Sequence, residues 1–100
     1  MVVIRKTDQY SEWFSELKDR AARARIDVRL RRFSLGNPGV VKSVGEGVSE
    51  LKFDFGPGYR VYIGYEGLEL VILLGGGDKS TQTKDIKAAQ KLLKELKEIE

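Results

Sequence analysis

The chain has 100 residues and a formal net charge of +3, and it contains neither cysteine nor histidine. The absence of cysteine excludes disulfides, thiolate zinc sites and cysteine nucleophiles, and the absence of histidine removes the usual general base near neutral pH. The length predicts one domain over residues 1–100, in which acid–base chemistry must use Lys, Arg, Asp, Glu or Tyr.

The N-terminal stretch MVVIRKTDQY reaches charged residues too early for a signal peptide. Elsewhere, no stretch approaches the ~20 apolar residues that span a bilayer. We therefore expect a soluble, cytoplasmic protein with no membrane partner.

The first half of the chain predicts a strand and two helices. The β-branched run at residues 2–4 is typical of a buried strand, and Thr7 or Asp8 can cap the helix that follows. Asp19 then caps a second helix. The apolar residues repeat at helical spacing, first as Tyr10, Trp13, Phe14 and Leu17, and then as Ala22, Ile26, Leu30 and Phe33. The short connection between the helices predicts an antiparallel hairpin.

The second half predicts a sheet and a last helix. Residues 36–47 form a glycine-rich loop in which 40–42 are a candidate short strand, and strands are expected at 49–55, 59–65 and 68–74. A final helix begins near Ser80 or Thr81. The predicted order, β-α-α-β-β-β-α, is an α+β fold: an N-terminal strand and a helical hairpin packed on a curved, mostly antiparallel sheet, with a C-terminal helix.

Three glycines, Gly75–Gly77, precede the sequence DKST between a strand and a helix. A phosphate-binding loop has a similar position, but this stretch lacks the second glycine and the spacing of a Walker motif. We therefore interpret the glycines as a sharp exit from the sheet, with Asp78 and Lys79 as the candidate functional part.

The alternation of apolar and polar residues on the two predicted strands directs Lys52 and Arg60 away from the apolar face. Lys79 lies just after the end of the next predicted strand. Three such cations suit a phosphodiester backbone, and Tyr62 on the same face could stack on a base. The alternative is that Lys52 and Arg60 form cross-strand pairs with acidic neighbours, Glu50, Asp54 or Glu69. Both interpretations remain open at this point.

The second predicted helix is rich in arginine. Residues 20–42 carry seven basic residues and one acidic residue, Asp27. The arginines cannot all face the core, and they are expected to bind RNA or an acidic stretch of a protein partner, or else to form a solvated face; they include Arg23, Arg25, Arg29, Arg31 and Arg32.

The runs GVSELKFDFGPGYRVYIG at residues 47–64 and LLGGGDKSTQTKDIKAA at residues 73–89 resemble the RelE/ParE toxin superfamily, as does the opening IRKTDQYSEWFSELKDRAARARI at residues 4–26. The nearest branch is that of the HigB-like toxins, or addiction module killer proteins. The resemblance covers essentially the whole chain. It implies the toxin component of a type II toxin–antitoxin system, blocked by a cognate antitoxin with which such toxins often form heterotetramers.

The resemblance also implies alternative activities. In the RelE and HigB branches the toxin is an mRNA interferase, which cleaves mRNA in the ribosomal decoding site without metal or other cofactor. In the ParE branch the toxin binds DNA gyrase without nuclease activity. A third alternative is a non-catalytic binding member of the fold.

The resemblance assigns candidate roles to individual residues. Arg60 matches an arginine that contacts the scissile phosphate, Lys52 is a candidate base or phosphate ligand, and Lys79 is a candidate acid or phosphate ligand. The catalytic histidine of some HigB toxins and the C-terminal tyrosine of RelE have no counterpart here. The remaining candidate RNA contacts are Arg23, Arg25, Arg29, Arg32, Tyr62, Asp78 and Ser80.

Overall fold

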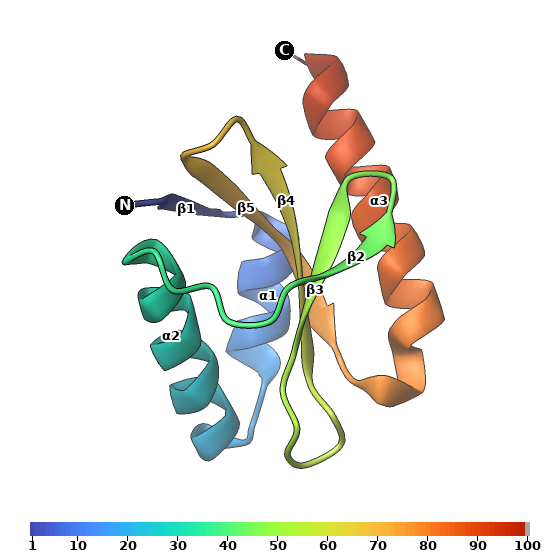
Figure 1. Cartoon of the computed structure of the whole chain (residues 1–100). Coiled ribbons are helices and arrows are strands. Elements are labelled where there is room, and N and C mark those ends of the chain that lie inside the picture. Colours follow the sequence, from blue (N-terminus) through green and yellow to red (C-terminus); the bar gives the residue numbers. More distant parts are fainter. Residues whose placement is uncertain (100) are drawn as a thin grey trace.

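A five-stranded sheet with helices on both faces forms the protein (Figure 1), as described for residues 1–99 in a computed structural model. The strand order across the sheet is β1-β5-β4-β3-β2, in which β1 pairs in parallel with β5 and every other pairing is antiparallel. In chain order the elements are β1 (Val3–Lys6), α1 (Asp8–Glu16), α2 (Arg20–Ser34), β2 (Lys42–Gly45), β3 (Val48–Lys52), β4 (Arg60–Glu66), β5 (Leu70–Gly77), the 3-10 turn η1 (Lys79–Thr81) and α3 (Gln82–Ile99). The predicted α+β fold, with its mostly antiparallel sheet, is confirmed.

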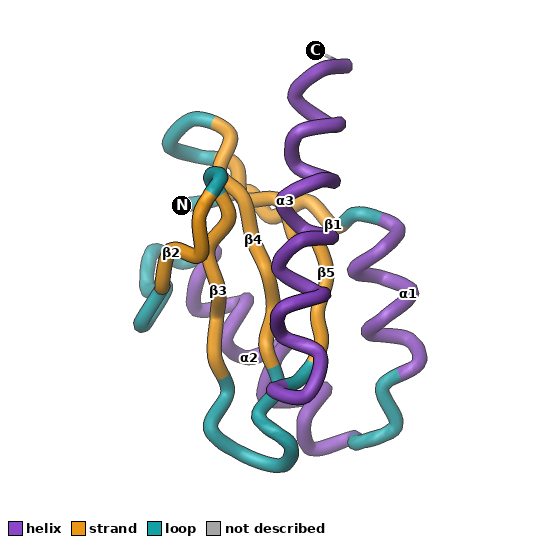
Figure 2. The backbone as a smooth tube through the Cα atoms, turned by 90° about the vertical axis from the view of Figure 1, so that its right-hand side faces the viewer, coloured by secondary structure: helices purple, strands orange, loops and turns teal. Residues whose placement is uncertain are grey.

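The helices divide between the two faces of the sheet. Figures 1 and 2 show α1 and α2 on one face and α3 on the other. The α1–α2 pair covers a core of Tyr10, Ile26, Leu30, Phe33, Leu51, Phe53, Val61, Ile63, Val71 and Leu73. The α3 side has its own core, made of Val48, Tyr62, Ile72, Leu74, Ala89 and Leu93. Both faces of the sheet are therefore buried along its centre.

The helix starts follow the capping residues. Thr7 Oγ1 accepts a hydrogen bond from the N–H of Tyr10 (3.2 Å) and donates one to the carbonyl of Leu73 (2.7 Å), so the cap of α1 is also fixed to β5. At the start of α2, Asp19 accepts from the N–H of Ala22 (3.0 Å). The two predicted caps that begin the helical hairpin are confirmed.

One strand more than predicted is present. The segment expected as a loop, with a candidate strand at residues 40–42, instead contains β2 at Lys42–Gly45, paired with β3. The tight turn between them places Glu46 at φ 54° and Gly47 at φ 81°. Two successive positive φ angles are typical of the hairpin turn that joins antiparallel strands with a matching twist.

The interpretation of Gly75–Gly77 as an exit from the sheet was wrong. All three glycines lie inside β5 and pair with Tyr62, Val61 and Arg60 of β4. The chain leaves the sheet only at Asp78, whose carboxylate accepts the N–H of Ser80 (2.8 Å) and so begins η1.

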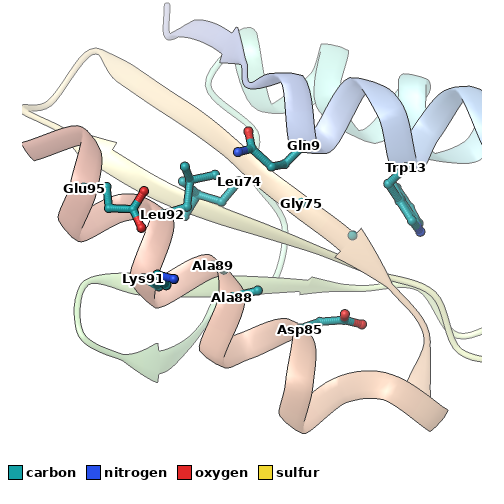
Figure 3. A pocket seen from close by; sticks show the side chains of 11 residues that line it. Gln9, Trp13, Leu74, Gly75, Asp85, Ala88, Ala89, Lys91, Leu92 and Glu95 are labelled. Atoms are coloured by element: carbon teal, nitrogen blue, oxygen red, sulfur yellow. The ribbon is translucent and has the colours of Figure 1, made fainter.

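Two of the three glycines, Gly76 and Gly77, are required because helices approach both faces of β5 at this end, whereas a Cβ atom on Gly75 would meet open space. A Cβ atom on Gly76 would collide with the ring of Trp13 in α1, and one on Gly77 would collide with the carboxylate of Asp85 in α3. Figure 3 shows Trp13 and Asp85 on either side of the strand, beside a hollow of about 330 Å³ between the two helices. Gly76 and Gly77 therefore make room for side chains of the two flanking helices.

Among residues 1–99, no helix combines the length and the hydropathy that a membrane crossing requires.

Candidate functional site

Three cationic side chains predicted from the sequence lie around one hollow. Lys52 and Arg60 are directly opposite each other at the open ends of β3 and β4, and Lys79 approaches from η1. The hollow has a volume of about 420 Å³ and is also lined by Asp54, Phe55 and the turn at residues 56–58. The structure thus brings together the three residues to which catalytic roles were assigned. We call this the cation hollow.

Arg60 is buried, with 5% of its surface exposed, although alternation predicted an outward position. Its Nε donates to Glu50 Oε1 (2.7 Å) and its Nη1 donates to the carbonyl of Gly58. Gln82 of α3 donates to the same Glu50 oxygen (2.8 Å). The prediction of solvent exposure failed because α3 covers the sheet face that the strand pattern left polar.

The buried contacts fix the orientation of the Arg60 guanidinium. In residues 1–99 its third nitrogen, Nη2, donates to no protein acceptor, and Arg60 remains part of the lining of the cation hollow. A guanidinium held on two sides presents its free edge without first having to become ordered. Arg60 can therefore still contact an anion in the hollow.

Lys52 and Lys79 are the exposed cations of the hollow. The Nζ of Lys52 lies 3.4 Å from Asp54 Oδ1, and both side chains are largely in solvent, 59% and 83% exposed. Exposed pairs of this kind contribute about 0–1 kcal/mol, so an incoming anion can compete for Lys52. The predicted acidic pairs are present, since Lys52 pairs with Asp54 and Arg60 with Glu50. Lys52 and Arg60 also share one hollow with Lys79, and phosphodiester binding there stays a prediction.

Asp78 and Ser80 build the turn that carries Lys79. Asp78 Oδ1 accepts hydrogen bonds from the N–H and the hydroxyl of Ser80, at 2.8 and 2.5 Å. These bonds hold the pKa of Asp78 below its usual value, so its carboxylate stays ionised and fixed in the turn. Their contacts assign these two residues a positioning role for Lys79.

Tyr62 cannot stack on a base in this structure. Its side chain is fully buried under α3 with Ala89 and Leu93, and its hydroxyl has no partner among the described residues. Burial, together with the charge of Glu50, raises the pKa of Tyr62 to about 12. The prediction of a base contact from Tyr62 is wrong for the same reason as the predicted exposure of Arg60.

The arginines of α2 lie on two flanks of the helix. Arg25, Arg29 and Arg32 line a second hollow of about 440 Å³ that shares Lys52 and Asp54 with the cation hollow. Arg23 lies on the other flank, with its guanidinium carbon 5.1 Å from the centre of the Phe14 ring of α1. Only the first three therefore extend the basic surface around Lys52.

Arg29 is a structural residue within this group. Its Nη1 donates to the carbonyl of Lys52 and its Nη2 donates to the carbonyl of Val40, each at 2.6 Å. Partial burial lowers its pKa, and its guanidinium carbon lies 5.1 Å from the centre of the Phe53 ring. Arg29 thus joins α2 to the end of β3, which leaves Arg25 and Arg32 as the candidate RNA contacts of the second hollow.

Gln82 had no predicted role in this region, and Glu50 and Asp54 were predicted only as possible pairing partners of Lys52 and Arg60. Asp54 is the carboxylate that lines the cation hollow, and Glu50 and Gln82 support Arg60. The amphipathic pattern of the last helix was the signal that could have predicted the burial of Glu50 and Arg60. A helix with one apolar side must cover a sheet face, and the available face is the one that carries Glu50 and Arg60.

The arrangement suits an anion with several oxygen atoms. Three cations surround a hollow that is open to solvent, and the rigid member of the set, Arg60, offers a donor suited to phosphate oxygens. Within residues 1–99, no group of three or more acidic side chains lies close enough together to hold a metal ion.

A protein of Haemophilus influenzae (strain ATCC 51907 / DSM 11121 / KW20 / Rd), described as "Uncharacterized protein", is 50% identical to this chain over 95 residues. The match covers 95% of this chain and 96% of that protein. No family model matches the chain. No solved structure matches it either.

Proposed function

We propose that this chain, which belongs to the family of the Haemophilus influenzae protein, binds and cleaves an RNA phosphodiester in the cation hollow, as the toxin of a type II toxin–antitoxin system. The observation that carries the proposal is the convergence of Lys52, Arg60 and Lys79 on one hollow from three separate elements. The resemblance of the strand and turn segments to RelE and HigB toxins supplies the toxin context.

The charges of the hollow support phosphate binding. Lys52 and Lys79 are exposed cations, whereas Arg60 is buried and held by Glu50 and by the carbonyl of Gly58. Donors that are already oriented stabilise developing negative charge without the cost of reorganisation. Arg60 is therefore assigned to the phosphate oxygens, where charge increases in the pentavalent transition state.

The proposed reaction is attack of the ribose 2′-oxygen on the neighbouring phosphorus. The new P–O bond forms as the bond to the 5′-oxygen of the next nucleotide breaks, which leaves a 2′,3′-cyclic phosphate and a 5′-hydroxyl. The Asp54 carboxylate takes the proton of the 2′-hydroxyl, and the Lys79 ammonium gives a proton to the departing 5′-oxygen. Lys52 stays charged beside Asp54 and binds the phosphate.

The shape of the site supports dependence on a larger partner. The cation hollow is open to solvent, and Tyr62, the aromatic residue expected to hold a base, is buried. Alignment of the 2′-oxygen with the leaving oxygen must then come from whatever else holds the RNA, and the translating ribosome in the cytoplasm is the proposed source. A cognate antitoxin is the proposed inhibitor.

A non-catalytic binding protein is the second candidate function. The observation that favours it is the buried Arg60–Glu50 pair, which satisfies both charges without any ligand. In that case the hollow and the arginines of α2 bind a polyanion, and no bond is broken.

Expression of the protein alone in a bacterial host, with mapping of transcript 5′ ends, tests the proposal. The expected result is growth arrest with new cuts inside translated codons. Both effects should be lost in Lys79→Ala and kept in Lys18→Ala, which removes an exposed charge away from the hollow. Growth arrest without cuts would identify a protein target such as gyrase, and the absence of arrest from folded protein would favour the binding function.

A further inference from the structure

The outer side of α3 carries a row of five exposed lysines, spaced three or four residues apart: Lys84, Lys87, Lys91, Lys94 and Lys97. At 1.5 Å per residue the row is about 20 Å long. Figure 2 shows α3 in front of the sheet over most of its length. We call these five residues the lysine row.

The lysine row is continuous with the cation hollow. Lys79 lines the cation hollow and also a hollow of about 590 Å³ at the start of α3, together with Lys84 and Lys87. Lys87 in turn lines a hollow of about 680 Å³ beside Lys91, Lys94 and Lys97. Shared lysines therefore connect the two surfaces without a break.

No ion pair neutralises the lysine row in the part of the chain that the structure describes, and the hollow that four of its lysines line has two acidic residues, Glu46 and Glu98. Within residues 1–99, the ion pairs are those of Lys52 with Asp54 and of Arg60 with Glu50, and neither involves α3. The acidic residue nearest the start of the row, Asp85, accepts a hydrogen bond from Thr81 (2.5 Å). The ammonium groups are thus free to exchange solution anions for phosphates.

We propose that the lysine row is a second binding surface, which takes the phosphate backbone of double-helical RNA and is continuous with the cation hollow. This inference rests on the proposed function, because it names a further RNA element held by the same protein. A helical RNA presents closely spaced phosphates along each strand, so a row about 20 Å long contacts several of them.

The composition of α3 favours a duplex over a single strand. The helix contains no aromatic residue, so it offers no platform on which unpaired bases can stack. Recognition of double-helical RNA relies on shape and on backbone contacts, for which exposed lysines are sufficient.

The composition of α3 also favours RNA over an acidic protein. Stable protein interfaces have an apolar centre, whereas the only large apolar side chain of α3 described as exposed is Ile99, at the end of the helix. A row of cations without an apolar centre suits a polyanion.

A pair of triple variants tests the inference. The row variant is Lys87→Gln, Lys91→Gln and Lys94→Gln, and the control variant is Lys6→Gln, Lys18→Gln and Arg20→Gln. The control removes the same charge from residues that line neither the cation hollow nor the three hollows that share residues along this surface, those of about 440, 590 and 680 Å³. Binding of a fluorescent duplex RNA and of a single strand of the same length is measured by anisotropy at several salt concentrations, after circular dichroism has confirmed folding.

For duplex RNA, the logarithm of the association constant falls with the logarithm of the salt concentration, and the magnitude of this slope should be smaller by about 2–3 in the row variant. Each phosphate that the protein no longer neutralises reduces the magnitude of the slope by about 0.9. The control should change by less than about 1, since its charges lie off the proposed surface. Equal changes in the two variants, no change in the row variant, or tighter binding of the single strand by wild type would each overturn the inference. The inference would also be overturned, in favour of an acidic protein partner, if wild type bound poly-glutamate as tightly as duplex RNA and the row variant lost that binding.

The cleavage assay separates this inference from the proposed function. If cleavage disappears in Lys79→Ala but the salt slopes of the row and control variants are equal, the lysine-row inference is overturned and the proposed nuclease function is kept. A shallower slope in the row variant, from a wild-type protein that cuts no RNA, supports the inference and overturns the nuclease.

Discussion

Glu50 and Arg60 form an ion pair across β3 and β4, with 2.7 Å between Glu50 Oε1 and Arg60 Nε and with side chains that are 4% and 7% exposed. The two residues are diagonal neighbours in the sheet, since Glu50 lies opposite Tyr62, and Arg60 lies opposite Lys52. Because α3 excludes water from the pair, each charge depends on the other for compensation.

Removal of one partner should therefore be costly. Glu50→Ala leaves the Arg60 guanidinium buried and uncompensated, and it should lower the free energy of unfolding by about 3–5 kcal/mol in urea denaturation. The matched control is Asp54→Ala, which breaks the exposed pair with Lys52 and should cost at most about 1 kcal/mol. Equal effects of the two changes would contradict the assigned burial.

A double replacement tests the same pair from the opposite direction. Glu50→Leu combined with Arg60→Met removes both charges and keeps similar volumes, so stability should return to within about 1–2 kcal/mol of wild type or exceed it. The same double variant should lose RNA cleavage, because Arg60 is the proposed phosphate ligand. A stable double variant that still cleaves would exclude that role for Arg60.

The close approach of α1 to β5 predicts different outcomes at two adjacent glycines. Gly76→Ala places a methyl group against the ring of Trp13 and should destabilise the fold by about 1–3 kcal/mol. Gly75→Ala meets open space and should cost much less. Trp13 is the only tryptophan, so its fluorescence should shift in the first variant and not in the second.

Arg29 should tolerate no replacement by lysine. A lysine cannot span the carbonyls of Lys52 and Val40 at once, and the loss of a charged hydrogen bond should cost about 1.5–3 kcal/mol. Arg32→Lys, at an exposed position of the same helix, should stay within about 0.5 kcal/mol of wild type. Thermal unfolding of the two variants measures the difference, and similar melting temperatures would contradict the structural role.

The burial of the Tyr62 side chain should make the folded protein lose stability in alkaline solution. Its pKa is raised to about 12 in the folded protein, because burial disfavours the phenolate. In the unfolded chain a tyrosine titrates at about pH 10, so stability is fully present below that pH and is lost as the pH rises through the folded value. Tyr62→Phe should flatten this fall, and the exposed Tyr65→Phe should not.

At neutral pH the same replacement tests the unpartnered hydroxyl of Tyr62. Because this group is buried without a hydrogen-bond partner among the described residues, its removal should leave the free energy of unfolding unchanged or raise it by about 1–3 kcal/mol. A clear loss of stability in Tyr62→Phe would indicate a partner for the hydroxyl.

Local signals identified the start of each N-terminal helix and the residues of the cation hollow. Thr7 and Asp19 cap the helices because their side chains need only nearby backbone N–H groups. Lys52 and Lys79 line one hollow because Lys52 ends β3 and Lys79 follows β5, and the C-terminal ends of these two strands lie at the same end of the sheet. These features depend on short stretches of chain.

The errors concern what covers each face of the sheet. Alternation separates Arg60 and Tyr62 from the apolar residues of β4, but it does not reveal which side of a strand faces water. Both residues are buried because α3, which follows later in the chain, returns over that face. Gly76 and Gly77 of β5 were misread for a related reason, since only the approach of Trp13 and Asp85 explains them.

The parallel pairing of β1 with β5 has a consequence for the order in which the protein assembles during its own synthesis. The cap residue Thr7 is bonded to Leu73, 66 positions later, so β1 leaves the ribosome long before its partner strand exists. The hairpins of β2, β3 and β4 are local and can form first, whereas the sheet closes only when β5 is made. Lys79 lies two residues after the end of β5, so a nascent chain acquires all three cations of the cation hollow only as the final helix is being added.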